Sequence, residues 1–214
     1  CPGARNAPLI YPLVHSSQVQ IYYWPEERSA AFFALGRIKA TGRPVAVVTT
    51  SGTAAGELLP AAMEAHYTGL PLVLVTADRP RRFRGTGAPQ SAEQMGLFSH
   101  YVSEAQDVAD GDLCFLENWK KESPIHLNIC FEEPKDSDCQ EIRLKKCEIR
   151  QKTFSNYGKM DEKEYLSFLK KSCFPLVIVG AMPLEAREAA IQFLLHLGAP
   201  VYAEGISGIR EDPR

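Results

Sequence analysis

The sequence predicts an α/β fold with a doubly wound, mainly parallel sheet, followed by the start of a second α/β unit. Three apolar runs are continuous rather than alternating, namely Val45–Val48, Leu72–Val75 and Leu176–Val179. Strands buried on both faces have this pattern, because helices cover both sides of a parallel sheet. Apolar residues at helical spacing between the runs give the alternation of strand and helix that is typical of this fold.

The expected elements follow one another with short turns. Along the first part of the chain they are a strand at 19–23, a helix at 27–40, a strand at 45–48, a helix at 53–67, a strand at 72–75, a helix at 111–121 and a strand at 125–129. Gly42 supplies the stop for the first helix, and Ser51 is expected to act as the N-cap of the second.

Composition divides the chain into three regions. Residues 1–134 are expected to form the first domain. Residues 135–172 are rich in Lys, Glu, Asp and Ser and are expected to form a linker with one helix at 161–171. Residues 173–214 hold a strand, a helix at 186–197 and a second strand start, which is too little to bury both faces of a sheet. Both ends of the sequence look cut, so we expect a piece of a longer protein.

Charge and cysteine usage exclude several functions. The chain has 24 Lys+Arg against 26 Asp+Glu, and a nucleic-acid binder would usually be clearly basic. No apolar run reaches about 18 residues, so no membrane-spanning helix is expected. The six cysteines form no C-x-x-C pair, which argues against structural zinc and favours reduced thiols in a cytoplasmic protein.

The chemistry is expected at the carboxyl ends of the strands, where open α/β sheets bind their ligands. Glu26 and Glu27 lie in the first turn of a helix, and Ser51–Gly52 and Asp78–Arg79 follow buried strands. From position alone, the two glutamates are better explained as carboxylates that the helix dipole favours than as functional groups. The spacing of a P-loop and that of G-x-G-x-x-G are both missing, so Rossmann-type dinucleotide binding is unsupported.

Several longer stretches of the sequence resemble those of known enzyme families. ERSAA at 27–31 and the following ALGRIKATGRPVAVVTTSGTA resemble the pyrimidine-binding domain of thiamine diphosphate enzymes. More narrowly, CPGARNAPL at 1–9, TADRP at 76–80 and GAPQ at 87–90 resemble the 2-succinyl-5-enolpyruvyl-6-hydroxy-3-cyclohexene-1-carboxylate synthase family of menaquinone biosynthesis. This resemblance implies a transferase that decarboxylates 2-oxoglutarate and adds the succinyl-semialdehyde unit to isochorismate. It also implies a homodimer or homotetramer with the active site at the subunit interface.

The resemblance implies a role for individual residues. Glu27, which lies nine residues before Gly36, would bond N1′ of the aminopyrimidine and favour the tautomer that takes the C2 proton. Arg5 and Arg79 would bind substrate carboxylates, for which a planar guanidinium is suited. Gln90 would lie close to the reacting carbons, and the cofactor would also contact Pro2 and Thr50. The chain departs from the family's commoner serine at Cys1 and Ala4, and from a frequent asparagine at Pro89.

The cofactors implied are thiamine diphosphate and Mg²⁺, but the family's G-D-G…N motif for the metal is missing. The only Gly-Asp pair, Gly111–Asp112, continues with Leu113. No metal ligands are therefore expected in these 214 residues, which alone are expected to be inactive. Two alternatives stay open: an acetolactate synthase-like thiamine diphosphate enzyme, and a non-catalytic α/β binding module.

Overall fold

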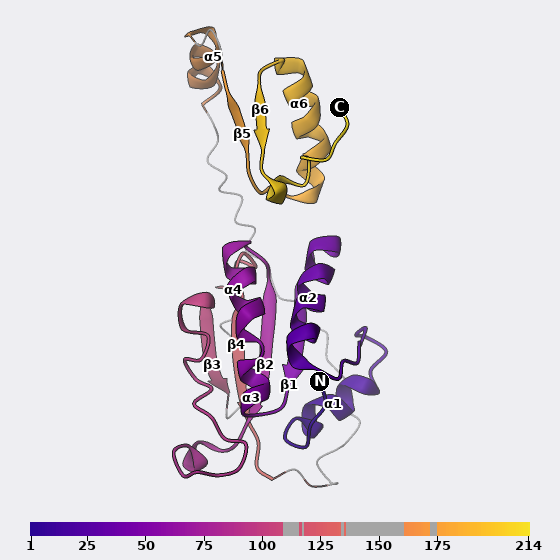
Figure 1. Cartoon of the computed structure of the whole chain (residues 1–214), viewed down its shortest axis with the longest axis vertical. Coiled ribbons are helices and arrows are strands. Elements are labelled where there is room, and N and C mark those ends of the chain that lie inside the picture. Colours follow the sequence, from indigo (N-terminus) through magenta and orange to yellow (C-terminus); the bar gives the residue numbers. More distant parts are fainter. Residues whose placement is uncertain (109–115, 117, 134, 136–160, 172–174) are drawn as a thin grey trace. The chain divides into compact units, whose positions relative to one another are not determined.

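The structure is a computed structural model that describes residues 1–108, 116, 118–133, 135, 161–171 and 175–214. The chain divides into two compact units, Cys1–Lys152 and Thr153–Arg214 (Figure 1). Each unit has its own parallel sheet, which confirms the predicted α/β class and the start of a second α/β unit. The domain boundaries at 134 and 172 remain a proposal, because most of the residues between them lie outside the described part.

The sheet of the first unit has four strands in the order β1-β2-β4-β3. They are β1 (Val45–Thr49), β2 (Leu72–Asp78), β3 (Glu104–Val108) and β4 (Ile125–Cys130). Every pairing is parallel, with Val45 opposite Leu72, and Ile125 opposite both Val73 and Glu104. The carboxyl ends of all four strands therefore lie at one edge of the sheet.

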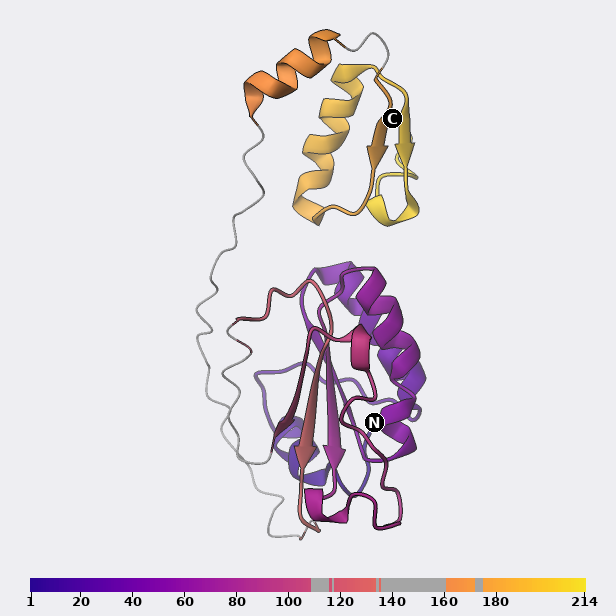
Figure 2. The same ribbon diagram turned by 90° about the vertical axis from the view of Figure 1, so that its left-hand side faces the viewer.

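Alternate side chains of β2 point to opposite faces of the sheet, as strand geometry requires. Leu72 and Leu74 pack with α2 (Glu27–Thr41) and α4 (Leu59–Tyr67), whereas Val73 and Val75 pack with Leu9 of α1 (Ala7–Val14). Figure 2 shows the sheet edge-on, with α2 and α4 on one side and α1 on the other. Helices on both faces account for the continuous apolar run in this strand.

The ends of α2 confirm the expected helix. The side chain of Glu26 accepts hydrogen bonds from the backbone N–H groups of Arg28 and Ser29, and Gly42 closes the helix in the left-handed conformation at φ 66°. Left-handed backbone at this position is strained for a residue that carries a Cβ.

The helix predicted at 53–67 is interrupted, so that prediction was wrong in detail. It consists of α3 (Thr53–Gly56) and α4, which begins at Leu59 with Pro60 in its first turn. Proline has no N–H to donate inside a helix but fits the first turn, where that N–H would be unpaired. The N-cap of α3 is Gly52, not the expected Ser51.

The strand predicted at 19–23 does not form. Its aromatic residues instead pack on α2, where the Tyr22 and Trp24 rings lie 5.0 and 4.6 Å from that of Phe33. A cavity of about 890 Å³ lies between this segment and β1, so its backbone has no strand partner among the described residues. The helix predicted at 111–121 falls mostly outside the described residues, and residues 119–121 within it are not helical.

The second unit is a small βαβ arrangement preceded by a helix. It contains α5 (Glu162–Lys171), β5 (Val177–Val179), α6 (Arg187–Leu197) and β6 (Val201–Ala203). Val179, Ile191 and Ile209 form its core, whereas Ile178 and Tyr202 are 68% and 62% exposed. The unit thus buries one face of its sheet, as its size predicts.

Candidate active site

The loops that carry the sequence-predicted residues meet at the carboxyl edge of the first sheet. They are the turn Cys1–Asn6, the segment Thr50–Gly52 after β1, the loop 79–98 after β2 and the segment 131–133 after β4. This edge is where ligands bind in open α/β sheets, and we take it as the candidate active site.

The N-terminal turn is held by the buried side chain of Asn6. Its Oδ1 accepts from the backbone N of Gly3 at 2.8 Å, and its Nδ2 donates to the carbonyl of Cys1 at 2.9 Å. A Cβ placed on Gly3 would lie 2.6 Å from Cβ of Thr50, so only glycine permits this approach. The turn therefore rests on Thr50, which joins it to the loop after β1, and Pro2 is exposed beside it.

Arg5 and Arg79 come from segments far apart in sequence and reach the same carboxylate. Arg5, which is 6% exposed, donates to Oε2 of Glu133 at 2.6 Å and to the carbonyls of Phe131 and Glu132. Nη1 of Arg79 lies 3.7 Å from the same Oε2, and Nε of Arg79 donates to the carbonyl of Pro89 at 2.9 Å. The two guanidinium groups thus form one carboxylate-binding position.

Gln90 lies against the loop after β1. The Ser51 hydroxyl donates to the Gln90 carbonyl at 2.9 Å, and Nε2 of Gln90 donates to the Ser51 carbonyl at 3.1 Å. Gln90 itself is exposed and has φ 55°, which is left-handed backbone that costs a residue with a side chain about 1–2 kcal/mol. Such strain persists only where neighbouring contacts hold it.

The two glutamates at the start of α2 have different surroundings. The carboxylate of Glu26 accepts from Ser29 and Arg28, and the bond from Ser29 holds the pKa of Glu26 below its usual value. Glu27 is half-buried, and its carboxylate accepts no hydrogen bond from the described residues. Glu26 is therefore engaged as a cap, while Glu27 is free to meet a ligand. No ion pair or hydrogen bond joins Glu27 to the arginines or Gln90 among the described residues.

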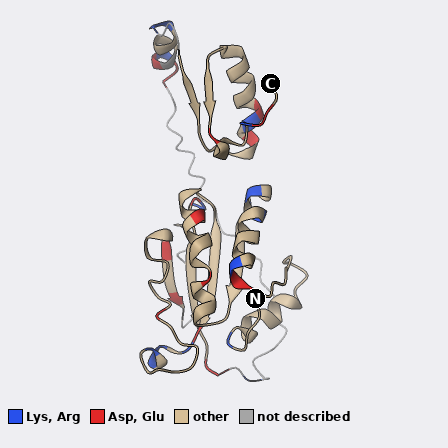
Figure 3. Cartoon of the chain, viewed as in Figure 1, with Lys and Arg blue, Asp and Glu red and all other residues tan. Residues whose placement is uncertain are grey.

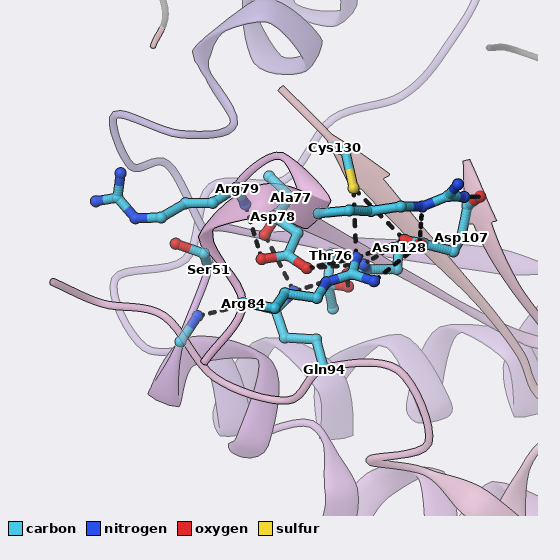
Figure 4. Close-up of polar contacts among 12 residues, drawn as sticks. Ser51, Thr76, Ala77, Asp78, Arg79, Arg84, Gln94, Asp107, Asn128 and Cys130 are labelled. Carbon is cyan, nitrogen blue, oxygen red and sulfur yellow. Dashed lines mark hydrogen bonds and ion pairs between the residues drawn. The ribbon is translucent and has the colours of Figure 1, made fainter. Parts of the chain in front are cut away.

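A polar network fixes the ends of β2, β3 and β4 behind these residues (Figure 4). Asn128 donates to both Asp78 and Asp107 at 2.9 Å, and Arg84 donates to Asp107 at 2.7 Å and to Asp78 at 3.1 Å. Burial alone would raise the pKa of Asp107, but hydrogen bonds from Arg84, Asn128 and Arg81 outweigh it and hold the pKa well below its usual range. Asp107 therefore stays ionised and keeps the loop 79–98 attached to β3.

Two titratable groups near this network are poor candidates for chemistry. Burial lowers the pKa of His126 to about 4, and its Nε2 is hydrogen-bonded to Thr76 at 2.7 Å within the core. Burial and the Asp107 carboxylate raise the pKa of the Cys130 thiol to about 11, which keeps it protonated and unreactive. Cys1 and Cys130, the described cysteines, are both free thiols.

Other features of the described residues do not compete with this site. The cavity beside β1 has a mainly apolar lining, and Arg5, Arg79 and Gln90 do not contribute to it. Basic and acidic residues are interspersed along the ribbon instead of forming one basic face (Figure 3). Within the described ranges there is no metal-binding group of three or more His, Cys, Asp or Glu, and no helix has the length and apolar character to cross a membrane.

Sequence reasoning missed the residues that support the site. Asn6, Gln94, Asn128 and Glu133 make many of its contacts, yet none was singled out. Asn128 left a usable signal, because a polar residue in the middle of a buried strand needs buried partners. Glu133 and Gln94 left none, since their roles depend on which loops meet in space.

The sequence is similar to one protein family model and to several curated enzymes. Residues 1–97 match the family model described as "Thiamine pyrophosphate enzyme, N-terminal TPP binding domain". The chain is 46% identical over 217 residues to the 2-succinyl-5-enolpyruvyl-6-hydroxy-3-cyclohexene-1-carboxylate synthase of Bdellovibrio bacteriovorus, covering 100% of this chain and 41% of that protein. The enzyme of the same name from Akkermansia muciniphila is 40% identical, with 99% of this chain and 40% of that protein covered.

Solved structures show the same fold. A protein from Mycobacterium smegmatis described as thiamin diphosphate-dependent matches with a TM-score of 0.71 and 16% identity, covering 96% of this chain and 40% of its own. The thiamine diphosphate-dependent 4-hydroxybenzoylformate decarboxylase of Rhodococcus jostii RHA1 matches with a TM-score of 0.70 and 15% identity, covering 94% and 40%. At these identities the likeness concerns the fold alone.

The curated relatives thus match the chain over nearly its whole length, and the chain spans about 40% of theirs. The family match includes Arg5, Glu27, Arg79 and Gln90, whereas segment 131–133 of the candidate active site lies beyond it. The chain is therefore similar to the thiamine diphosphate enzymes, and its first 97 residues match the N-terminal domain of that family.

Proposed function

We propose that the full-length protein is a thiamine diphosphate-dependent synthase of menaquinone biosynthesis. It decarboxylates 2-oxoglutarate and adds the resulting succinyl-semialdehyde unit to isochorismate. The observation that carries the proposal is the convergence of Arg5 and Arg79 on one carboxylate oxygen of Glu133. Both substrates are dicarboxylates, and paired guanidinium groups are well suited to bind them.

The residues present fit the cofactor. A half-buried glutamate without a hydrogen-bond partner, next to a neighbour that already caps the helix, can bond a ring nitrogen. Glu27 would hold the proton at N1′ of the aminopyrimidine, and Thr50 and Pro2 would contact the cofactor at the turn that rests on Gly3. When bound, thiamine diphosphate supplies the carbanion chemistry at its C2 atom. Gln90, on the neighbouring loop, would lie close to the reacting carbons of the substrates.

The assembly and metal site are further parts of the proposal. The sequence holds no G-D-G…N motif, so the Mg²⁺ ligands would come from outside these 214 residues, and the 214 residues alone would be inactive. We expect a cytoplasmic homodimer or homotetramer in which two subunits complete each site.

The proposal is tested by replacing Glu27 with Gln in the full-length protein. The substitution keeps the shape but removes the carboxylate, so C2 hydrogen–deuterium exchange of the bound cofactor should slow by about 10²–10⁴-fold, with a similar loss in kcat. Glu26→Gln is the matched control, because it alters only the helix cap and should leave the exchange rate unchanged. An unchanged exchange rate in Glu27→Gln would refute the role of Glu27.

A further inference from the structure

The side chain of Gln94 joins three parts of the candidate active site. It is completely buried in the loop after β2. Its Oε1 accepts from the backbone N of Gly52 at 2.8 Å, and its Nε2 donates to Oδ1 of Asn128 at 2.8 Å and to the carbonyl of Ala77 at 3.2 Å. One amide therefore ties the loop after β1 to the ends of β2 and β4, and Figure 4 shows it beneath the Asp78 and Asn128 side chains.

The loop that Gln94 holds is also the one that supports Gln90. Ser51 exchanges two hydrogen bonds with Gln90, and a Cβ on Gly52 would lie 2.9 Å from Cγ and 3.0 Å from the carbonyl oxygen of Gln90. The left-handed backbone of Gln90 needs such contacts to persist. A shift of Ser51–Gly52 would therefore move Gln90, although Gln94 does not itself touch it through any of these bonds.

We propose that Gln94 is a positioning residue that fixes the Ser51–Gly52 turn and thereby the Gln90 side chain. The inference rests on the proposed function, in which Gln90 lies at the reacting carbons. Gln94 has no exposed surface with which to meet a substrate, so its effect passes through the turn. A displacement of about 1 Å at a reacting group is enough to cost on the order of 10²-fold in rate.

The test uses the full-length enzyme with 2-oxoglutarate and isochorismate. Gln94→Met keeps the length of the side chain but removes all three hydrogen bonds, and we expect kcat to fall by about 10–100-fold. C2 exchange of the bound cofactor should stay at the parent rate, because it depends on Glu27. Without any ligand, amide hydrogen exchange at Gly52 should accelerate, since its N–H loses its acceptor.

Thr76→Val is the matched control. Thr76 is equally buried and donates to the same Oδ1 of Asn128, but it makes no hydrogen bond to the Ser51–Gly52 turn. If Gln94 only maintained the fold, the two variants would lose similar amounts of activity, which would overturn the proposal. We expect Thr76→Val to keep kcat within about threefold of the parent, because this substitution should affect only the stability of the fold.

A double-mutant cycle separates positioning from general support. In a Gln90→Ala background, Gln94→Met should lower kcat no further, because the group that it positions is already missing. An equal loss in both backgrounds would overturn the role of Gln94 and leave the proposed function standing. Full activity of Gln90→Ala would overturn the role of Gln90 and that of Gln94 together. If Gln94→Met does not fold, Gln94→Asn, which is too short to reach both Gly52 and Asn128, takes its place in the cycle.

Discussion

Arg5 and Arg79 differ in how firmly hydrogen bonds hold their guanidinium groups. Arg5 is buried and uses Nη1 for two backbone carbonyls, so its orientation is set by the chain that follows β4. Arg79 is held by one hydrogen bond from Nε to the carbonyl of Pro89, and its Nη1 reaches Glu133 only at 3.7 Å. Arg79 is therefore the arginine whose terminal nitrogens can turn to a substrate at little cost.

The substitution Arg79→Ala in the full-length enzyme should weaken the use of a carboxylate substrate without affecting cofactor activation. A hydrogen bond to a charged group is worth about 1.5–3 kcal/mol, so we expect KM to rise by about 10–100-fold for at least one substrate. Steady-state kinetics with each substrate in turn measures this. Arg82→Ala is the control in the same loop, because Arg82 forms its ion pair with the exposed Glu132 and otherwise lies over the ring of Phe83. Equal increases in KM for both variants would contradict the assignment.

Residues with a family motif could be predicted from the sequence, and residues that support them could not. Arg5, Arg79, Gln90 and Glu27 stand in short runs that resemble known ones, although their catalytic roles stay a proposal. Glu133 was missed because it is an exposed residue in a charged stretch, and only the meeting of two loops gives it partners. Tertiary contacts of this kind leave no pattern along the chain.

At the scale of elements, the apolar strands were predictable because burial on both faces demands continuous apolar runs. The edge strand β3 was missed, since its sequence EAQDV is mostly polar. Helix α1 was missed because Pro8 and Pro12 argue against a helix, yet Pro8 lies in its first turn. The strand expected at 19–23 was wrong because β-forming residues also serve as aromatic packing against α2.

Gly52 is the N-cap of the short helix α3, and replacing this glycine should disturb the element. Gly52 has φ 80°, and an added Cβ would lie 2.9 Å from Gln90, so Gly52→Ala should lower the free energy of unfolding by about 1–3 kcal/mol. Gly56→Ala in the same helix meets nothing within 4 Å and should be neutral or stabilising by up to about 1 kcal/mol. Urea denaturation of the chain distinguishes the two, and a Gly52→Ala protein as stable as Gly56→Ala would contradict this reading.

At the scale of the whole molecule, the two units differ in how far the faces of their sheets are buried. The first unit covers both faces of β2 and holds a carboxylate–guanidinium network in which Arg84 binds both Asp78 and Asp107. The second leaves Ile178 and Tyr202 largely exposed. Its strands could be predicted, because apolar runs form strands whether or not both faces find a cover.

The stability of the first unit should depend on pH through His126. Burial lowers the pKa of this group to about 4. Between pH about 6.5 and 4, His126 therefore binds a proton in the unfolded chain but stays neutral in the folded chain. Stability should therefore fall as the pH drops from about 6.5 to 4, by about 2 kcal/mol at pH 5 from this group. Trp24 and Trp119 both lie in the first unit, so their fluorescence during urea denaturation at pH 7.5 and 5 measures the effect.

His126→Gln should lose this part of the pH dependence, because glutamine does not titrate. His15→Gln is the control, since His15 is an exposed histidine of the same unit. If the parent and His126→Gln lose the same stability between the two pH values, the buried neutral imidazole is not the cause.

The central place of β2 also sets the order in which the first unit can fold. β1 and β2 are separated by residues 50–71, but β4 reaches β2 only across residues 79–124. Closing the longer stretch costs more chain entropy, and nearby pairs form sooner. The loop that carries Arg79, Gln90 and Gln94 finds Asn128 and Glu133 only after β4 has docked. During synthesis, the candidate active site therefore stays unformed until residue 133 has left the ribosome, well after the strands beside it have paired.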